Sequence, residues 1–205
     1  MAFEVRDARP DDRTGPRLLY LSAQPYYDAY TGSPERSRRM LEAIWRKPGH
    51  TAGYDRCRLL CDAERAVGVL VAFPAEAGDA FARRFLAVSL LRMGVWRWPH
   101  VLRHLRAAAT VMPVPPERSL YVDALAVEPE ARRHGGATAL LRDAEATAAR
   151  SGLRGVSLDT GLQNHAAQAL YEAYGFVASG ERRAADERVA AAIGGPGFVS
   201  YFKPL

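Results

Sequence analysis

A strand signal, a glycine pair and a helical run follow one another between residues 119 and 150, and this succession restricts the fold most. SLYVDALAV (119–127) is the strongest strand pattern in the chain, ARRHGG (131–136) combines two arginines, a histidine and two glycines, and good helix formers continue to Arg150. The first amides of a helix lack internal partners and carry partial positive charge, so they stabilise anions. Glycine removes the Cβ that would obstruct a ligand, and arginine donates paired hydrogen bonds to phosphate. The segment therefore predicts a strand–loop–helix unit that holds a pyrophosphate.

Two familiar phosphate-binding loops are excluded by spacing. The sequence has no G-x-x-x-x-G-K-[ST] motif, and no G-x-G-x-x-G follows an opening strand. A tight turn that requires positive φ is the alternative interpretation of the glycines.

The other patterns predict a mixed α/β fold in one domain over residues 1–205. Asp11 and Asp12 are expected to cap a first helix that ends near Leu21, and Ser33-Pro34 to start a second that Pro48-Gly49 ends. Strands are expected at 3–8, 57–63, 66–73, 119–127, 155–160, 175–183 and 197–204, with later helices at 135–150 and 165–174.

A helical insert is expected over about residues 78–112, between the third and fourth strands. Apolar residues recur there at helical spacing, and Pro99 interrupts the run. A solvated basic face is the simpler interpretation of its arginines, and a lid over an anionic ligand is the alternative. The apolar positions are Phe81, Phe85, Val88, Leu91 and Val95, then Leu102, Leu105, Ala109 and Met112; the charged ones are Arg83, Arg84, Arg92, Arg97, Arg103, Arg106 and the single acid Asp79.

The composition gives only weak information on the ligands and the cellular location of the protein. The formal charge of +5 over 205 residues suits anionic ligands. Cys57 and Cys61 lie within one predicted strand, where a disulfide has poor geometry and no histidine cluster completes a metal site, so we expect two buried free thiols. No apolar leader and no apolar run of about 20 residues is present, which predicts a cytoplasmic protein without a membrane partner.

Two motifs resemble those of a known family. LAVEPEARRHGGATALL (125–141) is similar to the acetyl-CoA motif [QR]-x-x-G-x-[GA] of the GNAT superfamily of N-acetyltransferases, through Arg132, Gly135 and Ala137. The pattern N-x-x-A-x-x-L-Y-x-x-x-G-F of the same family follows about 30 residues later. The long insert resembles the puromycin N-acetyltransferase type more loosely. The second motif is matched by Asn164, Ala167, Leu170, Tyr171, Gly175 and Phe176.

The resemblance implies a mostly antiparallel central sheet whose fourth and fifth strands splay apart around acetyl-CoA. The pantetheine arm would pair with the backbone of Leu125, Ala126 and Val127, and Asn164 and Tyr171 would contact the cofactor. The pyrophosphate would lie on the segment formed by Arg132, Arg133, His134, Gly135, Gly136, Ala137 and Thr138.

The implied reaction moves an acetyl group from the thioester to an amine by direct attack in a ternary complex. An alkylamine with a pKa near 10.4 needs about 4.6 kcal/mol to become neutral at pH 7, so a base or a water chain is expected. In many family members a tyrosine at the position of Tyr171 protonates the leaving sulfur; core packing is the alternative role.

Two carboxylates compete for the role of the base. Asp159 ends the strand 155–159, where some family members place a glutamate that activates the amine, and we favour it. Asp123 lies in an apolar strand, where a carboxylate is costly unless it is paired or solvated. Joint action of the two, or water alone, remains open.

The acceptor is expected between the first two helices. Tyr26, Tyr27 and Tyr30 with Asp28 would suit an organic cation, and ordinary surface-loop tyrosines are the alternative. We therefore expect an N-acetyltransferase that acts on a primary amine of a small molecule or on a peptide N-terminus. A catalytically silent acyl-CoA-binding module is the second possibility. Nucleic-acid binding by the insert ranks last, because the insert is expected to lack exposed aromatics among its arginines.

Overall fold

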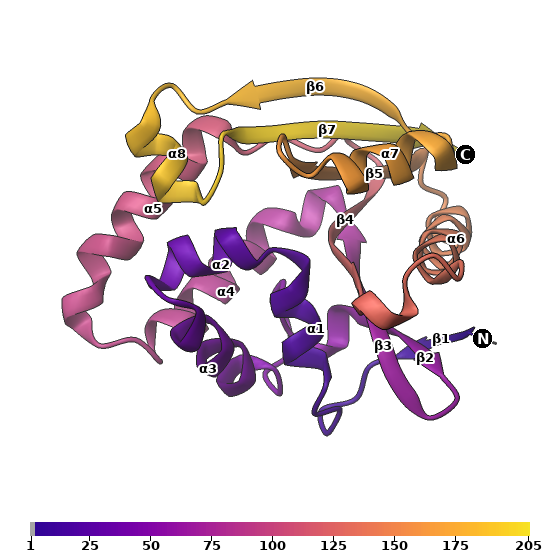
Figure 1. Cartoon of the computed structure of the whole chain (residues 1–205), viewed down its shortest axis with the longest axis horizontal. Coiled ribbons are helices and arrows are strands. Elements are labelled where there is room, and N and C mark those ends of the chain that lie inside the picture. The colour runs from indigo at the N-terminus through magenta and orange to yellow at the C-terminus, as the bar shows by residue number, and fades with distance from the viewer. Residues whose placement is uncertain (1–2) are drawn as a thin grey trace.

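In the described part of the chain, seven strands form one mixed sheet in the order β1-β2-β3-β4-β5-β7-β6 (Figure 1). The computed structural model describes residues 3–205. Neighbouring strands are antiparallel except for β4 and β5, which are parallel. The strands are β1 (Phe3–Asp7), β2 (Cys57–Asp62), β3 (Arg65–Pro74), β4 (Ser119–Val127), β5 (Gly155–Gly161), β6 (Val177–Arg183) and β7 (Gly197–Pro204).

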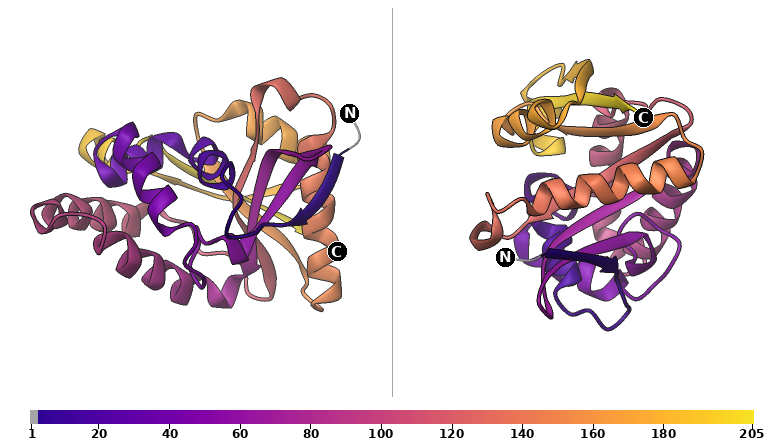
Figure 2. Two further views of the ribbon diagram at one scale, coloured as in Figure 1. Left: turned by 90° about the horizontal axis from the view of Figure 1, so that it is seen from below. Right: turned by 90° about the vertical axis from the view of Figure 1, so that its right-hand side faces the viewer.

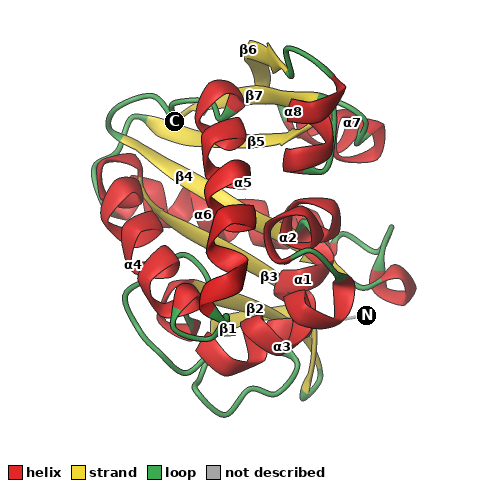
Figure 3. Cartoon of the chain, turned by 90° about the vertical axis from the view of Figure 1, so that its left-hand side faces the viewer, coloured by secondary structure: helices red, strands yellow, loops and turns green. Residues whose placement is uncertain are grey.

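Eight α-helices in the described chain surround this sheet (Figures 2 and 3). The helix α6 packs on β1 to β5, whereas α1, α3 and the insert helices share an apolar cluster with the opposite face of β2, β3 and β4. The helices are α1 (Gly15–Ser22), α2 (Gln24–Thr31), α3 (Pro34–Ile44), α4 (Gly78–Leu90), α5 (Trp98–Val111), α6 (Gly136–Arg150), α7 (His165–Tyr174) and α8 (Glu187–Ile193).

Alternation along β2 separates the two apolar clusters. Cys57, Leu59 and Cys61 point into the cluster of α1 and α3, and Leu60 points toward α6. Successive side chains of a strand lie on opposite faces, so an apolar strand covered on both sides supplies two cores. Both cysteines are free and buried, as the sequence predicts.

The strands β4 and β5 diverge after a short paired segment. They pair only from Ser119 with Gly155 to Val122 with Leu158, and the remainder of β4 pairs with β3 alone. The expected splaying of the fourth and fifth strands is therefore confirmed. In Figure 1 the strands β5 to β7 lie apart from the lower part of the sheet beyond this point.

A β-bulge in β4 coincides with the divergence. Val71 of β3 pairs with Ala124 and the next residue, Ala72, pairs with Val122, so Asp123 is an extra residue without a partner on β3. A bulge of this kind redirects side chains and interrupts alternation. Ala124 consequently joins the cluster on the α1 side, whereas Val122 belongs to the α6 side.

The N-terminal helices differ from the sequence expectation. QPYYDAYT forms the helix α2 instead of a connection between two helices, and α1 begins at Gly15. Asp12 does not cap α1, because its carboxylate accepts hydrogen bonds from Arg6 at 2.6 and 2.9 Å. The ion pair with Arg6 of β1 thus takes the place of the expected capping role of Asp12.

A short helix, α8, separates β6 from β7 and is absent from the predicted elements. Asp186 caps it by accepting a hydrogen bond from the amide of Val189 at 2.8 Å, and Gly194 ends it in a left-handed conformation. The helix packs on α5 and α2, and Ile193 is buried against α5.

The insert is a helical pair between β3 and β4, as expected, but α5 buries another face than the predicted one. Val101, His104 and Val111 are buried, whereas Leu102 is exposed. Pro99 lies in the first turn of α5, where its missing N–H has no consequence, so it starts this helix. A 3₁₀ turn at Val95–Arg97 precedes α5, and α8 and α2 pack on the face of α5 that is buried.

Two tryptophans of the insert are exposed, which corrects the expectation that aromatics are missing among its arginines. Trp96 and Trp98 expose 79% and 49% of their surface. No helix in residues 3–205 combines the length and apolar character that crossing a bilayer requires.

Candidate active site

A cavity of about 760 Å³ opens where β4 and β5 diverge. Its walls come from α1 and α2, the inner sides of α4 and α5, the splayed parts of β4 and β5, α7, and the segment before β7. Apolar and aromatic side chains form most of the lining, and Asp123 and Asp159 are the carboxylates in it. Such a cavity, largely apolar with few polar groups, is typical of a small-molecule site.

Asp123 enters the cavity at the bulge. Its side chain is accessible from the cavity. The cavity is itself surrounded by elements of the protein, so many protein atoms lie near the carboxyl group. Burial, and then the negative charge of Asp159, raise the pKa of Asp123 to about 7. At neutral pH this carboxyl group is therefore able both to accept and to release a proton.

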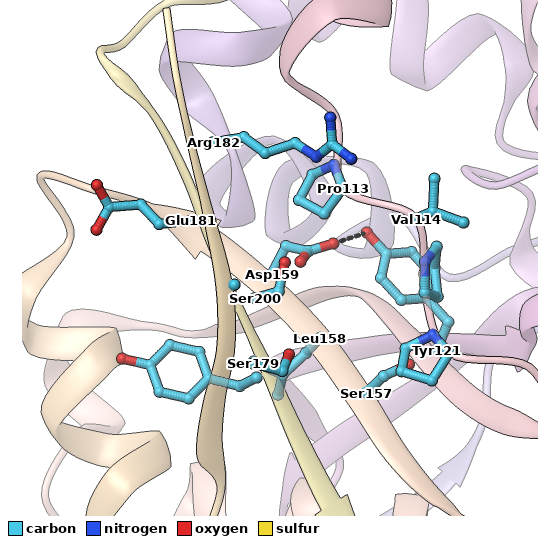
Figure 4. A pocket seen from close by; sticks show the side chains of 14 residues that line it. Pro113, Val114, Tyr121, Ser157, Leu158, Asp159, Ser179, Glu181, Arg182 and Ser200 are labelled. Atoms are coloured by element: carbon cyan, nitrogen blue, oxygen red, sulfur yellow. Dashed lines mark hydrogen bonds between the residues drawn. The ribbon is translucent and has the colours of Figure 1, made fainter.

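Asp159 is held by neighbours on two strands. The Tyr121 hydroxyl of β4 donates a hydrogen bond to Asp159 Oδ2 at 3.0 Å, drawn as a dashed line in Figure 4. Burial raises the pKa of Asp159, and hydrogen bonds from Ser200 and Tyr121 oppose this shift. Asp159 is thus a fixed carboxylate, whereas Asp123 has no such partner among the described residues.

Tyr171 reaches the same cavity from α7. Its ring is buried against Phe176 and Tyr201, with ring centroids 5.9 and 5.8 Å away. Tyr171 belongs to the cavity wall, and its hydroxyl makes no side-chain hydrogen bond within residues 3–205. Burial first, and then Tyr201 and Asp159, raise the pKa of Tyr171, so the phenol keeps its proton at neutral pH. It is available as a donor.

Asn164 caps α7 and also lines the cavity. Its Oδ1 accepts a hydrogen bond from the amide of Ala167 at 3.3 Å, and its Nδ2 donates to Thr160 Oγ1 at 3.1 Å. A capping role of this type stabilises the start of the helix that carries Tyr171.

The corner between β4 and α6 presents a run of unpaired amides. Within the described chain the backbone N–H groups of residues 133–138 donate no hydrogen bond, and the first of the following amides to do so is that of Ala139. Arg133 and Gly135 are both left-handed, with φ of +62° and +85°, a conformation that gathers successive amides into an anion-binding concavity. A Cβ on Gly135 would meet no atom within 4 Å, so the corner is open. These features fit a diphosphate.

Side chains near this corner contact the backbone and the sheet close by. Arg132 Nε donates to the carbonyl of Val127 at 2.9 Å, which ties the loop to the end of β4. His134 Nδ1 lies 2.7 Å from the carbonyl of Arg132. Gly136 begins α6 so close to the sheet that a Cβ would lie 2.6 Å from Leu60. Leu125 lines the cavity, Ala126 and Val127 are buried, and Ala137 and Thr138 are half-buried.

The predicted acceptor residues separate into two groups. Tyr26, Tyr27 and Tyr30 line the cavity from α2. Asp28 is absent from the lining, because its carboxylate accepts hydrogen bonds from Ser37 at 2.7 Å and from Tyr20 at 3.1 Å. Asp28 thus joins α2 to α1 and α3, and the structure does not bring it to the site.

Several wall residues escape prediction from the sequence. Tyr121 lies two positions before Asp123, and strand alternation alone would have indicated a shared face. Arg83, Phe85 and Leu105 belong to the insert, whose position over the cavity no local pattern reveals. In residues 3–205 no group of three or more histidine, cysteine or acidic side chains is arranged to hold a metal.

Comparison with known proteins agrees with this geometry. The model of the acetyltransferase (GNAT) family matches residues 20–176, which include both sequence motifs. No curated protein matches the sequence. An N-acetyltransferase from Staphylococcus aureus Mu50 superposes with a TM-score of 0.71 at 16% identity, covering 98% of this chain and 100% of that one.

Two further solved structures show the same fold. A structure described as an acetyltransferase has a TM-score of 0.68 at 18% identity, with 98% of both chains covered. A point mutant of an agmatine N-acetyltransferase, in its apo form, has a TM-score of 0.61 at 18% identity and 99% coverage of both. The family match over most of the chain, the splayed strands and the open amide corner lead to one conclusion: the chain belongs to the acetyltransferase (GNAT) family and is an acetyl-CoA-dependent N-acetyltransferase.

Proposed function

We propose that this protein, as one domain over residues 1–205, transfers the acetyl group of acetyl-CoA to a primary amine by direct attack in a ternary complex. The acceptor is a small organic amine or a peptide N-terminus. The observation that carries the proposal is that Asp123 and Tyr171 line one cavity, which opens where β4 and β5 diverge.

The chain offers two contacts for the cofactor. The edge of β4 from Asp123 to Val127 faces away from β3 and has no β5 partner, which suits pairing of Leu125, Ala126 and Val127 with the amides of the pantetheine arm. The unpaired amides of residues 133–138 suit the diphosphate, with Arg132 holding the loop in place. When bound, acetyl-CoA supplies the acetyl group as a thioester.

Asp123 is our preferred base. Its pKa of about 7 matches the working pH, which is the condition for effective general base catalysis. Asp159 already accepts a hydrogen bond from Tyr121, so its part is to raise the pKa of Asp123 through its charge. Asp123 would take a proton from the ammonium group of the acceptor, either directly or through one water molecule, and so produce the neutral amine.

Tyr171 is our preferred acid. Burial keeps the phenol protonated, and its hydroxyl makes no side-chain hydrogen bond among the described residues, so the proton can pass to the sulfur that leaves. Asn164 fixes the first turn of α7 and thereby the position of Tyr171 two turns later.

The acceptor end of the cavity favours an amine on an apolar or aromatic body. Tyr26, Tyr27 and Tyr30 provide ring faces and edges, and a cation held against aromatic rings gains electrostatic stabilisation. The two carboxylates attract the charged amine from β4 and β5. An agmatine N-acetyltransferase shares the fold, which is in line with a small amine acceptor.

An amine panel with acetyl-CoA tests the proposal. Release of free CoA thiol would be followed for amino acids, polyamines, aromatic amines and short peptides, with titration calorimetry of CoA in parallel. We expect CoA binding and thiol release that depends on one class of amine. CoA binding without amine-dependent release over the whole panel would instead assign the chain to the silent acyl-CoA-binding modules.

A further inference from the structure

The turn between α4 and α5 exposes an unusual number of large apolar side chains. The turn itself lies at one extremity of the molecule, at the left in Figure 1 and in the left panel of Figure 2. Exposed apolar clusters are rare on monomeric proteins and mark interaction surfaces. We call this surface the hairpin tip; its members are Leu91 (83% exposed), Val95 (66%), Trp96 (79%), Trp98 (49%) and Leu102 (47%).

The hairpin tip lies within a segment of one charge sign. Residues 80–116 contain six arginines and no aspartate or glutamate. Arg92, Arg103 and Arg106 are exposed, and within residues 3–205 no arginine of the insert forms an ion pair with a carboxylate. Arg36 of α3 and Arg97 extend the positive surface, since guanidinium nitrogens of both lie within 4 Å of a Cβ position at Gly32.

Against the expectation from the sequence that there is no membrane partner, we propose that the hairpin tip docks on the surface of a lipid bilayer that contains anionic lipids. Tryptophan prefers the boundary between headgroups and acyl chains, where its ring is buried and its N–H remains hydrated. Leucine and valine beside it enter the apolar layer, and arginines around them contact lipid phosphates, the combination typical of proteins that lie on a membrane without crossing it. Trp98 and Leu102 are one helical turn apart on α5 and present one face.

A second copy of the chain or a nucleic acid would fit the hairpin tip less well than an anionic bilayer. A two-fold contact between copies through the hairpin tip would bring Arg92, Arg103 and Arg106 of each copy close to those of the other, without acids in the segment to separate them. A nucleic acid would satisfy the arginines and stack on the tryptophans, but the exposed Leu91, Val95 and Leu102 would find no apolar partner on its charged backbone. An anionic bilayer satisfies both features.

Docking would place the cavity close to the membrane. The hairpin carries the exposed tip on its outer side, and its inner side contributes Arg83, Phe85 and Leu105 to the cavity wall. This inference goes beyond acetyl transfer and stands whether or not the proposed chemistry is correct, because its test measures binding alone.

Vesicle flotation provides the test. The whole protein would be mixed with vesicles of phosphatidylcholine alone or with added phosphatidylserine, and compared with a Trp96→Ser/Trp98→Ser variant and an Arg92→Gln/Arg103→Gln variant. We expect binding only to the anionic vesicles, weaker by about tenfold or more in either variant, and reduced by salt. Val177→Ser is the matched control, since Val177 is 68% exposed on β6 and belongs to no such cluster; its binding should equal that of the wild type.

Fluorescence gives a second readout. The chain has three tryptophans, and Trp45 is buried, so a blue shift on addition of anionic vesicles reports Trp96 and Trp98. Absence of binding to anionic vesicles at low salt would overturn the proposal. Tighter binding of a single-stranded oligonucleotide through the same tryptophans, or concentration-dependent dimerisation that the tryptophan variant abolishes, would also overturn it and assign the surface to that partner.

Discussion

The Tyr121 hydroxyl bonds to Asp159 Oδ2 at 3.0 Å, and both side chains belong to the walls of two cavities at once. The larger cavity holds Asp123 and Tyr171, and a smaller one of about 490 Å³ lies between residues 113–116 and β6. In Figure 4 the smaller cavity is seen with Arg182 extending toward Pro113. The Tyr121–Asp159 pair therefore forms part of the partition between the two spaces.

Replacing Tyr121 with phenylalanine should change the titration of the two carboxylates. Loss of the hydrogen bond raises the pKa of Asp159, which the bond now opposes. A less negative Asp159 repels charge on Asp123 less, so the pKa of Asp123 should fall below about 7. The acidic limb of the kcat/KM profile should move to lower pH, as the pair titrates together. A shift of the acidic limb to higher pH would contradict the assigned coupling between Asp159 and Asp123.

Asp123→Asn should remove the base. We expect kcat/KM to fall by about 10²–10⁴, the usual range for a lost general base, while CoA affinity in calorimetry stays the same. In the wild type, activity should rise with pH through about 7, because the deprotonated carboxylate is the active form. This limb should vanish in the variant. If Asp159→Asn proves the more damaging change and Asp123→Asn keeps the limb, Asp159 is the base.

Tyr171→Phe should separate binding from turnover. The ring contacts with Phe176 and Tyr201 remain, so the fold and the Kd for acetyl-CoA should be unchanged. Loss of the proton donor should lower kcat by about 10²-fold or more. Single-turnover kinetics would distinguish the chemical step from product release. Wild-type kcat in the variant would leave Tyr171 a packing residue.

Gly135→Ala tests the amide corner, and Gly152→Ala at the other end of α6 is its matched control. Gly135 and Gly152 flank α6, both have positive φ (+85° and +63°), and neither would have an atom within 4 Å of an added Cβ. Each alanine should cost about 1–2 kcal/mol of stability in denaturant unfolding, because the left-handed conformation disfavours a side chain. Only Gly135→Ala should also weaken CoA binding. Equal CoA affinities in the two variants would place the diphosphate elsewhere.

Acid should destabilise the protein through His104. Burial lowers its pKa below 6.5, so the unfolded state takes up a proton first, and the stabilising contribution is full above about pH 6.5 and declines below it. Asp123 acts in the opposite sense, since its raised pKa favours the folded state as pH falls below about 7. Comparison with His104→Phe isolates the histidine: the unfolding free energy of this variant should fall less between about pH 7.5 and 5.5. An identical decline of the unfolding free energy in the variant and the wild type would exclude His104 as the cause.

Local patterns were sufficient for much of the scaffold. The run from SLYVDALAV through the glycines to α6 indicates strand, open loop and helix because alternation, missing Cβ atoms and helix propensity act within a few residues. The second motif placed Tyr171 on α7 and Asn164 at the start of the same helix for the same reason. The predicted stripe on α5 was wrong because α8 and α2, which are distant in sequence, pack against the neighbouring face of this helix.

The sequence by itself indicated the family, the order of most elements and the candidate residues for the chemistry, since these depend on short-range spacing. Only the tertiary structure decided which carboxylate lines the cavity without a hydrogen-bond partner, because that depends on a bulge opposite β3 that places Asp123 at the gap left by β5. It also decided that Asp28 is engaged by Ser37 while Trp96 and Trp98 remain exposed. Burial and pairing are set by segments distant in sequence, and no local pattern contains them.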